Sequence, residues 1–486
     1  MNLSLLYPNG EVIQAIPTEF KTIYNLSIDQ AFANICPSLE KREYFFEVIS
    51  KLTSDKNIIE YRREILKDFQ LTDSLFTELY SVYERFNECK TSLKSNISPD
   101  TRMDFSYDSS LTSQKNILRI YSLAFKRSLY FVKKIKEILE SRNITSKGLV
   151  DLLNECTIIC EKSVFDGLVA ICAKYENLSE RGILDFKYTM TDNMRINSVE
   201  LVDHRYVHIT DPNLKKSKFS FFQHKPKQDF ICQEIESERN NFYNALISGA
   251  FSDMALLLKS LTKQLFDIFL PIYEELDFYY VSLKYIKFLE GKGLVYCFPS
   301  IVEDDSVHVE NLYDLFLVTQ SDNIQKIVPN NYNLINGQRG IVVFGNNGSG
   351  KTVYLRAFGT MQLLVQSGLP VPCSNGKIKL YSKIISQYAE AEYENPDGNK
   401  LGRFETEVKE LAEIIDSVNC KELILLNETF QSTSYTEGAD GLCSVLEYFI
   451  STENTFVLVS HLRDLERLLE DKNIGILYTR GGYKIS

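Results

Sequence analysis

The sequence lacks the long apolar segments, the basic leader and the paired cysteines that mark several classes of protein. No apolar run approaches the roughly 20 residues that a helix needs to cross a bilayer. No basic residue precedes the short apolar stretch near Met1, so we expect no secretory signal and no membrane partner. Only Cys156 and Cys160, of ten cysteines, lie close together, with a spacing unusual for zinc and no histidine nearby. We therefore expect structural core thiols in a reducing cytoplasm.

An excess of basic residues is also missing. The formal net charge is −11 for 486 residues, with 44% hydrophobic and 24% charged residues, as in an ordinary globular protein. A nucleic-acid role would therefore need a local basic patch, because the overall field repels phosphate. No internal repeat or low-complexity tract stands out, and the length predicts two to four domains.

Hydrophobic periodicity divides the chain into a helical part and an α/β part. Helical patterns cover residues 30–95, 114–142, 149–175 and about 235–289, with short strands and loops expected in an inset near 181–230. After residue 313 the expected strands are 341–344, 422–426 and 455–459, and the expected helices are 353–366, 404–418 and 439–450. We predict a helical domain over residues 1–310 and a nucleotide-binding α/β domain over residues 311–486.

A phosphate-binding loop follows the first of these strands. The pattern G-x-x-x-x-G-K-[ST] is formed by Gly345, Asn346, Asn347, Gly348, Ser349, Gly350, Lys351 and Thr352. Its glycines allow backbone N–H groups to close on the α- and β-phosphates, Lys351 can reach the β- and γ-phosphates, and the Thr352 hydroxyl can bind Mg²⁺. The apolar strand before the loop and the helix after it favour the same interpretation, since the helix N-terminus faces the phosphates.

Polar residues also end the other two strands. Asn427 and Glu428 follow the second strand, where a metal-binding Asp and a water-orienting Glu are usual in nucleotide hydrolysis. An amide at position 427 can accept a hydrogen bond from Thr352 or a metal-bound water, but it brings no charge to Mg²⁺. We therefore expect ATP binding with slow hydrolysis. His461 follows the third strand and could contact the γ-phosphate, although a histidine there is also common as a turn or cap residue.

Several motifs in order resemble the ATPase domain of the MutS family of DNA mismatch-repair proteins, over about residues 325–470. They are residues 328–334 (VPNNYNL), 345–356 (GNNGSGKTVYLR), 367–372 (SGLPVP), 402–407 (GRFETE, two residues shorter than the family's stretch), 425–438 (LLNE, then STS and EG) and 459–461 (VSH). The resemblance implies a helical core/lever domain followed by an α/β P-loop NTPase domain of the ABC-like, MutS type. It also implies Mg²⁺ and ATP as cofactors, with Val328 and Asn330 on the adenine side.

The same resemblance implies a homodimer in which two protomers pair head to tail and complete each other's ATP sites. Ser434, before the helix predicted at 439–450, would then approach the γ-phosphate held by the partner subunit, as a hydroxyl at a helix N-terminus can. A simple N-cap role for the serines and threonine of residues 432–434 explains the same residues, and this alternative stays open.

The inset near 181–230 lies where the family has its DNA clamp. Residues 213–227 hold five lysines and no acidic residue, and we take Lys215, Lys216 and Lys218 as candidate DNA contacts. A solvated loop is the competing interpretation. The chain begins almost directly at core-like helices and stops soon after His461. We therefore expect no mismatch-reading N-terminal domain and no helix-turn-helix tail, and do not assume mismatch specificity.

Three functions compete at this point. The first is a MutS-like, ATP-dependent DNA-binding ATPase whose dimer closes on DNA. The second is a non-hydrolysing, ATP-gated scaffold that recruits partners, which Asn427 favours and which Glu428 and His461 oppose. The third, another head-to-tail ATPase of the ABC or SMC kind, lacks the LSGGQ signature and a long heptad array.

Overall fold

The computed structural model of the chain describes residues 3–10, 20–72, 74–96, 111–176, 182–190, 196–206, 232–335, 337–388, 403–430, 433–480 and 483–486. Its contacts divide the chain into two compact units. The first unit combines residues 1–77, 142–152 and 271–486, and the second combines residues 78–141 and 153–270. The boundary that we predict between residues 310 and 311 stays a prediction.

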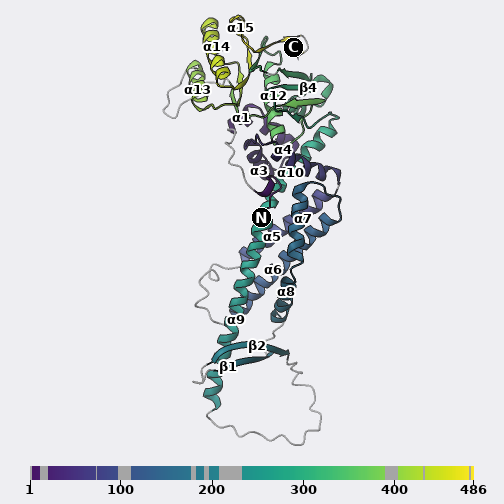
Figure 1. Ribbon diagram of the computed structural model, residues 1–486, viewed down its shortest axis with the longest axis vertical. Helices are drawn as coiled ribbons and strands as arrows, with labels where there is room; N and C mark the ends of the chain where they lie inside the picture. Colours follow the sequence, from purple (N-terminus) through teal and green to yellow (C-terminus); the bar gives the residue numbers. More distant parts are fainter. Residues whose placement is uncertain are drawn as a thin grey trace. The chain divides into compact units, whose positions relative to one another are not determined.

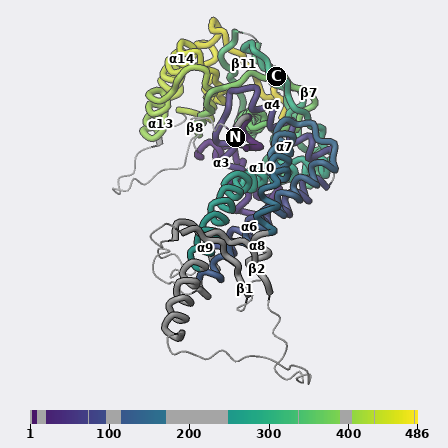
Figure 2. Tube along the Cα trace, turned by 60° about the horizontal axis from the view of Figure 1, so that its bottom comes forward, coloured from purple at the N-terminus to yellow at the C-terminus, as the bar shows by residue number. Residues whose placement is uncertain are grey.

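The second unit is built mainly from long helices. They are α5 (Leu75–Asn96), which begins in the first unit, α6 (Leu111–Glu140), α8 (Ser163–Glu176) and α9 (Cys232–Phe269). Helices α6 and α9 lie side by side (Figure 2). Phe86 on α5 packs its ring against Phe131 and Phe266, with ring centroids 5.3 and 5.6 Å apart, so aromatic residues join the three helices.

The inset contains an antiparallel pair of strands, β1 (Gly182–Met190) and β2 (Ile196–Tyr206), as its sequence predicts. The three candidate DNA contacts Lys215, Lys216 and Lys218 lie outside the described residues.

Two segments with a predicted helical pattern each form two helices. The segment 149–175 forms α7 (Lys147–Cys160) and α8, separated at residues 161–162. The segment 235–289 forms α9 and α10 (Pro271–Gly291). Pro271 explains the second break, because proline lacks the N–H that a continuing helix needs but fits the first turn of a new one.

The first unit contains four N-terminal helices beside α10. They are α1 (Phe20–Asn25), α2 (Ile28–Ile35), α3 (Leu39–Ser50) and α4 (Lys56–Leu71). Buried Phe32, Phe45 and Phe278 bring α2, α3 and α10 together through ring contacts. The helical pattern expected over residues 30–95 is thus confirmed for the described part of that range.

A six-stranded sheet forms the centre of the α/β part. Its strand order is β12 (Lys484–Ile485), β11 (Gly475–Arg480), β6 (Gly340–Phe344), β10 (Thr455–Ser460), β9 (Leu423–Asn427) and β8 (Ile384–Tyr388). All neighbours are parallel except β12, which pairs antiparallel with β11. The three strands predicted from apolar runs are therefore confirmed and lie side by side as β6, β10 and β9. Their continuous hydrophobicity fits parallel strands that are buried on both faces.

Helices cover both faces of this sheet. One face packs against α13 (Arg403–Ser417), α14 (Tyr435–Ser451) and α15 (Arg463–Leu469), which lie together in Figure 1. The other face carries α12 (Lys351–Gln366), and α1 contacts β8 through a hydrogen bond from Asn25 to Ser386. A Cβ on Gly359 of α12 would come within 2.5 Å of a Leu425 methyl and 2.7 Å of a Leu26 methyl. Only glycine allows this close approach of α12 to the sheet and to the N-terminal helices.

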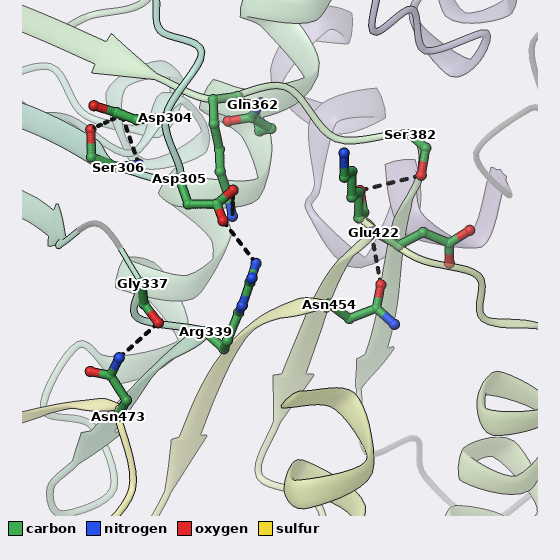
Figure 3. A network of polar contacts seen from close by, with 12 residues as sticks. Asp304, Asp305, Ser306, Gly337, Arg339, Gln362, Ser382, Glu422, Asn454 and Asn473 are labelled. Carbon is green, nitrogen blue, oxygen red and sulfur yellow. Dashed lines mark hydrogen bonds and ion pairs between the residues drawn. The ribbon is translucent and has the colours of Figure 1, made fainter. Parts of the chain in front are cut away.

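A smaller sheet of four strands lies beside the large one, in the order β3 (Ser300–Ile301), β7 (Asn375–Ile378), β4 (Val307–Leu312) and β5 (Asn330–Leu334). Figure 3 shows the polar contacts that join it to the amino end of the parallel strands. Asp305 accepts a 3.0 Å hydrogen bond from Arg339, at the start of β6, and pairs with Lys379 at 3.3 Å. Asn454, before β10, accepts a 2.8 Å bond from the Glu422 backbone N–H, before β9. The amino end of the parallel strands is thus stabilised by hydrogen bonds and ion pairs.

Helix α14 corrects one predicted boundary. The sequence predicts a helix over 439–450, but α14 begins at Tyr435. The Ser434 hydroxyl accepts the Glu437 backbone N–H and caps the helix, which begins four residues before the predicted start. Among the described residues, no helix has both the length and the apolar character that a membrane span requires.

Candidate nucleotide site

The loop between β6 and α12 owes its shape to three glycines. Gly348 and Gly350 have φ angles of 74° and 96°, in the left-handed region that favours glycine. Gly345 has no room for a side chain, because a Cβ there would come within 2.1 Å of the Thr479 hydroxyl oxygen. The loop therefore leads into the N-terminus of α12 with three positions that carry no side chain, which lets phosphate approach the backbone N–H groups closely.

Lys351, the first residue of α12, folds back over this loop. Its side chain is only 3% exposed, and its Nζ donates to the carbonyl oxygens of Gly345 at 2.8 Å and Asn346 at 3.0 Å. The same Nζ lies 3.1 Å from Oε1 of Glu428. A buried ammonium with an acidic partner is well placed to exchange these contacts for phosphate oxygens.

Thr352 and Asn427 meet at the carboxyl end of β9. The Thr352 hydroxyl donates a 3.0 Å hydrogen bond to Oδ1 of Asn427. This is one of the two contacts that the sequence predicts for the Asn427 amide. The pair offers two neutral oxygens, and among the described residues no group of three or more His, Cys, Asp or Glu residues is arranged to hold a metal ion. A Mg²⁺ ion here would thus take its remaining ligands from nucleotide and water.

Glu428 lies between Lys351 and His461. Its backbone has a φ of 56°, a conformation that few non-glycine residues adopt, and its N–H donates to the Val459 carbonyl at 2.9 Å. Its other carboxylate oxygen lies 3.8 Å from Nδ1 of His461. This nitrogen is buried and has no hydrogen-bond partner among the described atoms. The carboxyl ends of β6, β9 and β10 thus bring together Lys351, Glu428 and His461.

A cavity of about 560 Å³ opens beside the loop, a volume typical of small-ligand sites. Its lining combines the loop and α12 with Glu428, with the segment from Leu317 to Asn330 and with Tyr483. Val328 lines the cavity, as the resemblance implies. Asn330 does too, but its side chain is 7% exposed and accepts the Ile485 backbone N–H at 2.9 Å, so it also holds β12 in place.

A second hollow of about 530 Å³ is lined by Asn346, Asn347 and His461, together with Tyr435, Arg463 and Asp464. The Tyr435 ring lies edge-on to the His461 ring, with centroids 5.8 Å apart. The phosphate loop therefore borders both hollows. Ser349 bonds back to the Asn346 carbonyl at 2.6 Å and stabilises the loop between them.

Ser434 is exposed and lies at the start of α14. Its hydroxyl accepts the Glu437 N–H at 3.4 Å and donates to the Glu437 carboxylate at 2.8 Å. These bonds confirm the N-cap that the sequence allows, and they leave the predicted contact with a partner's phosphate untested.

Several residues at the site escape sequence reasoning. Tyr483 reaches the cavity only because β12 pairs with β11 and bonds to Asn330, and no local pattern signals this. Thr429, next to Glu428, is fully buried and donates a 2.5 Å hydrogen bond to Gln387 on β8. Gln387 in turn lies 3.4 Å from Glu410 on α13, which accepts a 2.6 Å bond from Lys21 on α1. The backbone beside Glu428 is thus connected to the N-terminal helices.

Comparison with known proteins gives concordant matches. Residues 341–476 match the family model described as MutS domain V. "Endonuclease MutS2" of Thermotoga petrophila is 30% identical over 139 residues, which are 28% of this chain and 18% of that protein. "Mitochondrial DNA mismatch repair protein mutS homolog" of Sarcophyton glaucum is 23% identical over 422 residues, 83% of this chain and 40% of that protein. "Endonuclease MutS2" of Lactobacillus acidophilus is 24% identical over 299 residues, 58% of this chain and 37% of that protein. The chain thus spans less than half of the length of these relatives.

Proposed function

This chain belongs to the MutS family, and on that premise we propose that it is a DNA-binding ATPase with a P-loop NTPase fold. The observation that carries this proposal is the convergence of Lys351, Glu428 and His461 at the carboxyl ends of three adjacent parallel strands. One relative is named a DNA mismatch repair protein and another an endonuclease, and a role in DNA repair is the corresponding proposal for this chain.

The residues of the site fit Mg²⁺ and ATP. The glycine-shaped loop and the helix N-terminus suit the phosphates, and Lys351 can transfer its hydrogen bonds from carbonyl to phosphate oxygens. Thr352 and Asn427 would hold Mg²⁺, which supplies charge neutralisation on the phosphates when bound. Glu428 would orient and deprotonate the attacking water, and the unpartnered Nδ1 of His461 would donate a hydrogen bond to a γ-phosphate oxygen.

Turnover is the property that separates this proposal from its rival, a non-hydrolysing ATP-gated scaffold. The rival is favoured by Asn427, because an amide brings no negative charge to the metal. Glu428 and His461 favour hydrolysis instead, because a carboxylate beside the phosphate loop can act as a base towards water. We therefore propose slow hydrolysis coupled to the closure of a head-to-tail homodimer on DNA.

The test is steady-state phosphate release, with and without DNA, by the whole chain and two variants. Glu428→Gln should lower kcat about a hundredfold or more without weakening nucleotide binding, because it removes the base without removing a phosphate contact. Glu413→Gln, an exposed change on α13, is the matched control and should behave as wild type. ATP binding without phosphate release in wild type, with or without DNA, would support the scaffold and refute the ATPase.

The DNA surface is proposed from sequence at Lys215, Lys216 and Lys218, in the inset that contains β1 and β2. Mobility shifts with duplex, mismatched and junction DNA would show which structure is bound most tightly. Because binding to phosphates releases counterions, affinities should be compared at several salt concentrations. Equal and weak affinity for all three DNAs would count against a DNA-binding role.

A further inference from the structure

Two cysteines that are 76 positions apart in the sequence meet in the first unit. The Sγ atoms of Cys297 and Cys373 lie 3.3 Å apart. Cys297 follows α10 and Cys373 follows α12, the helix that carries Lys351. An antiparallel bridge fixes the two segments, since Cys297 and Val371 exchange backbone hydrogen bonds of 3.0 and 2.9 Å. The proximity of the two thiols is therefore imposed by backbone pairing.

The two thiols have different surroundings. Cys297 is half-buried, whereas Cys373 is 1% exposed. The hydrogen bond between the two sulfur atoms lowers the pKa of the Cys297 thiol, and the Arg63 guanidinium lowers it further against the opposing effect of burial. The same bond and burial raise the pKa of the Cys373 thiol far above its usual range. Cys297 is thus the nucleophile of the pair and Cys373 its buried neighbour.

The Arg63 guanidinium uses only part of its hydrogen-bonding capacity. It is 3% exposed and binds Glu60 through Nη1 at 2.8 Å, while its buried Nε and Nη2 have no hydrogen-bond partner among the described atoms. Its guanidinium lies 5.7 Å from the Phe298 ring, next to Cys297. A buried cation with unused N–H groups favours a thiolate beside it.

We propose that Cys297 and Cys373 form a redox-sensitive dithiol site whose oxidant is hydrogen peroxide. The Cys297 thiolate attacks one peroxide oxygen, the O–O bond breaks, and the leaving hydroxide takes up the proton that the Cys297 thiol released, becoming water. The Cys373 sulfur then attacks the sulfenic sulfur of Cys297, the S–S bond forms and the S–O bond breaks. The Cys373 proton and the departing hydroxide make a second water, so two thiols lose two electrons and the peroxide gains them.

The disulfide would connect the segment after α10 covalently to the segment after α12. These segments are already paired, so the bond needs only a small approach of the two sulfur atoms. It would close a loop of 76 residues, which restricts the unfolded chain strongly. Oxidation should therefore raise the melting temperature of the first unit by several degrees, and reduction should reverse it.

The site can be tested on the whole chain with hydrogen peroxide, followed by alkylation of remaining thiols, digestion and peptide mapping. We expect a linked Cys297–Cys373 peptide and a mass lower by about 2 Da, the two hydrogens lost. Cys156 and Cys160 provide an internal control, because they are near in sequence but burial raises the pKa of both thiols. They should remain alkylatable at the peroxide dose that links the proposed pair.

Two variants separate the roles of the thiols. Cys373→Ser should accumulate a sulfenic acid at Cys297 that a dimedone probe traps, and Cys297→Ser should leave Cys373 unmodified. The melting temperature of each should not rise with peroxide. The proposal is overturned if wild type gives no linked peptide, if Cys297 oxidises directly to the sulfinic acid, or if Cys156 and Cys160 react as fast. Loss of the linked peptide on added dithiothreitol is also required.

Discussion

Glu275, on α10, is the buried carboxyl group whose ionisation should make stability depend on pH. It is 8% exposed, and it accepts a 2.6 Å hydrogen bond from the Ser4 hydroxyl and a 2.5 Å bond from the Leu5 backbone N–H. Burial raises the pKa of this carboxyl group from 4.5 to about 7, although those bonds and the Arg62 guanidinium oppose the shift. Glu275→Gln removes the ionisation and nearly preserves the shape of the side chain.

The magnitude follows from the linkage between protonation and folding. In the unfolded chain the carboxyl group loses its proton near pH 4.5, whereas in the folded protein it keeps it until about pH 7. Over that interval the folded state binds more protons, so stability falls as pH rises. A shift of this size contributes about 3 kcal/mol to the free energy of unfolding. This contribution is fully present below pH 4.5 and is lost once pH passes 7.

The assay is urea unfolding of wild type and Glu275→Gln, monitored by far-ultraviolet circular dichroism at several pH values between about pH 4.5 and pH 7.5. The difference in unfolding free energy between the two chains isolates Glu275, because other titrating groups contribute equally to both. The unfolding free energy of wild type should fall by about 3 kcal/mol relative to that of the variant as pH rises across this range. Glu274→Gln is the matched control on the same helix, since Glu274 is exposed, and it should not change the slope.

Two results would refute the reasoning. Parallel curves for wild type and Glu275→Gln would mean that the carboxyl group has the same pKa in the folded and unfolded states. A wild type that gains stability relative to the variant as pH rises would mean that Arg62 holds the carboxylate ionised and that its attraction exceeds the effect of burial.

Three further predictions concern the proposed function. Asn427→Asp should raise kcat more than it changes nucleotide affinity, because it adds a charge beside Mg²⁺; phosphate release and nucleotide titration decide this, and an unchanged kcat contradicts it. Ser434→Asp should keep the N-cap and the melting temperature, whereas Ser434→Ala should lower the free energy of unfolding by about 1 kcal/mol. If Ser434 contacts a partner's phosphate, both variants lose ATP-dependent dimerisation in ultracentrifugation. Normal dimerisation of the Asp variant would mean that Ser434 is only a helix cap. Changing Lys215, Lys216 and Lys218 together to Glu should weaken DNA binding and flatten its salt dependence in mobility shifts. The same change at exposed Lys377, Lys409 and Lys421 is the control and should have a smaller effect. Equal effects of the two triple variants would indicate only a change in net charge.

The elements that sequence predicts best are those whose signal is local. The strands β6, β9 and β10 are apolar throughout because both of their faces are buried, and parallel pairing places their polar end residues at one edge. The sequence could therefore predict that Lys351, Glu428 and His461 belong to one site. It could not predict that Glu428 pairs with Lys351, because that depends on the left-handed backbone at residue 428.

The elements that the sequence missed depend on distant partners. Strand β8 contains Ser386 and Gln387, whose polarity hides it from an apolar search. Both are buried because Asn25 bonds to Ser386 at 2.9 Å and Thr429 bonds to Gln387. Tyr483 and the pair of Cys297 with Cys373 likewise come together through pairing of segments that are far apart along the chain. Periodicity within one segment carries no information on such contacts.

The ion pair between Lys351 and Glu428 has a consequence for measurements of affinity. Its two side chains are 3% and 17% exposed, so little water screens their attraction. An incoming phosphate must compete with the Glu428 carboxylate for the same ammonium group, and the carboxylate also repels the phosphate. The wild-type site therefore holds an internal competitor for its own ligand, and Glu428→Gln should bind ATP more tightly than wild type while turning it over more slowly.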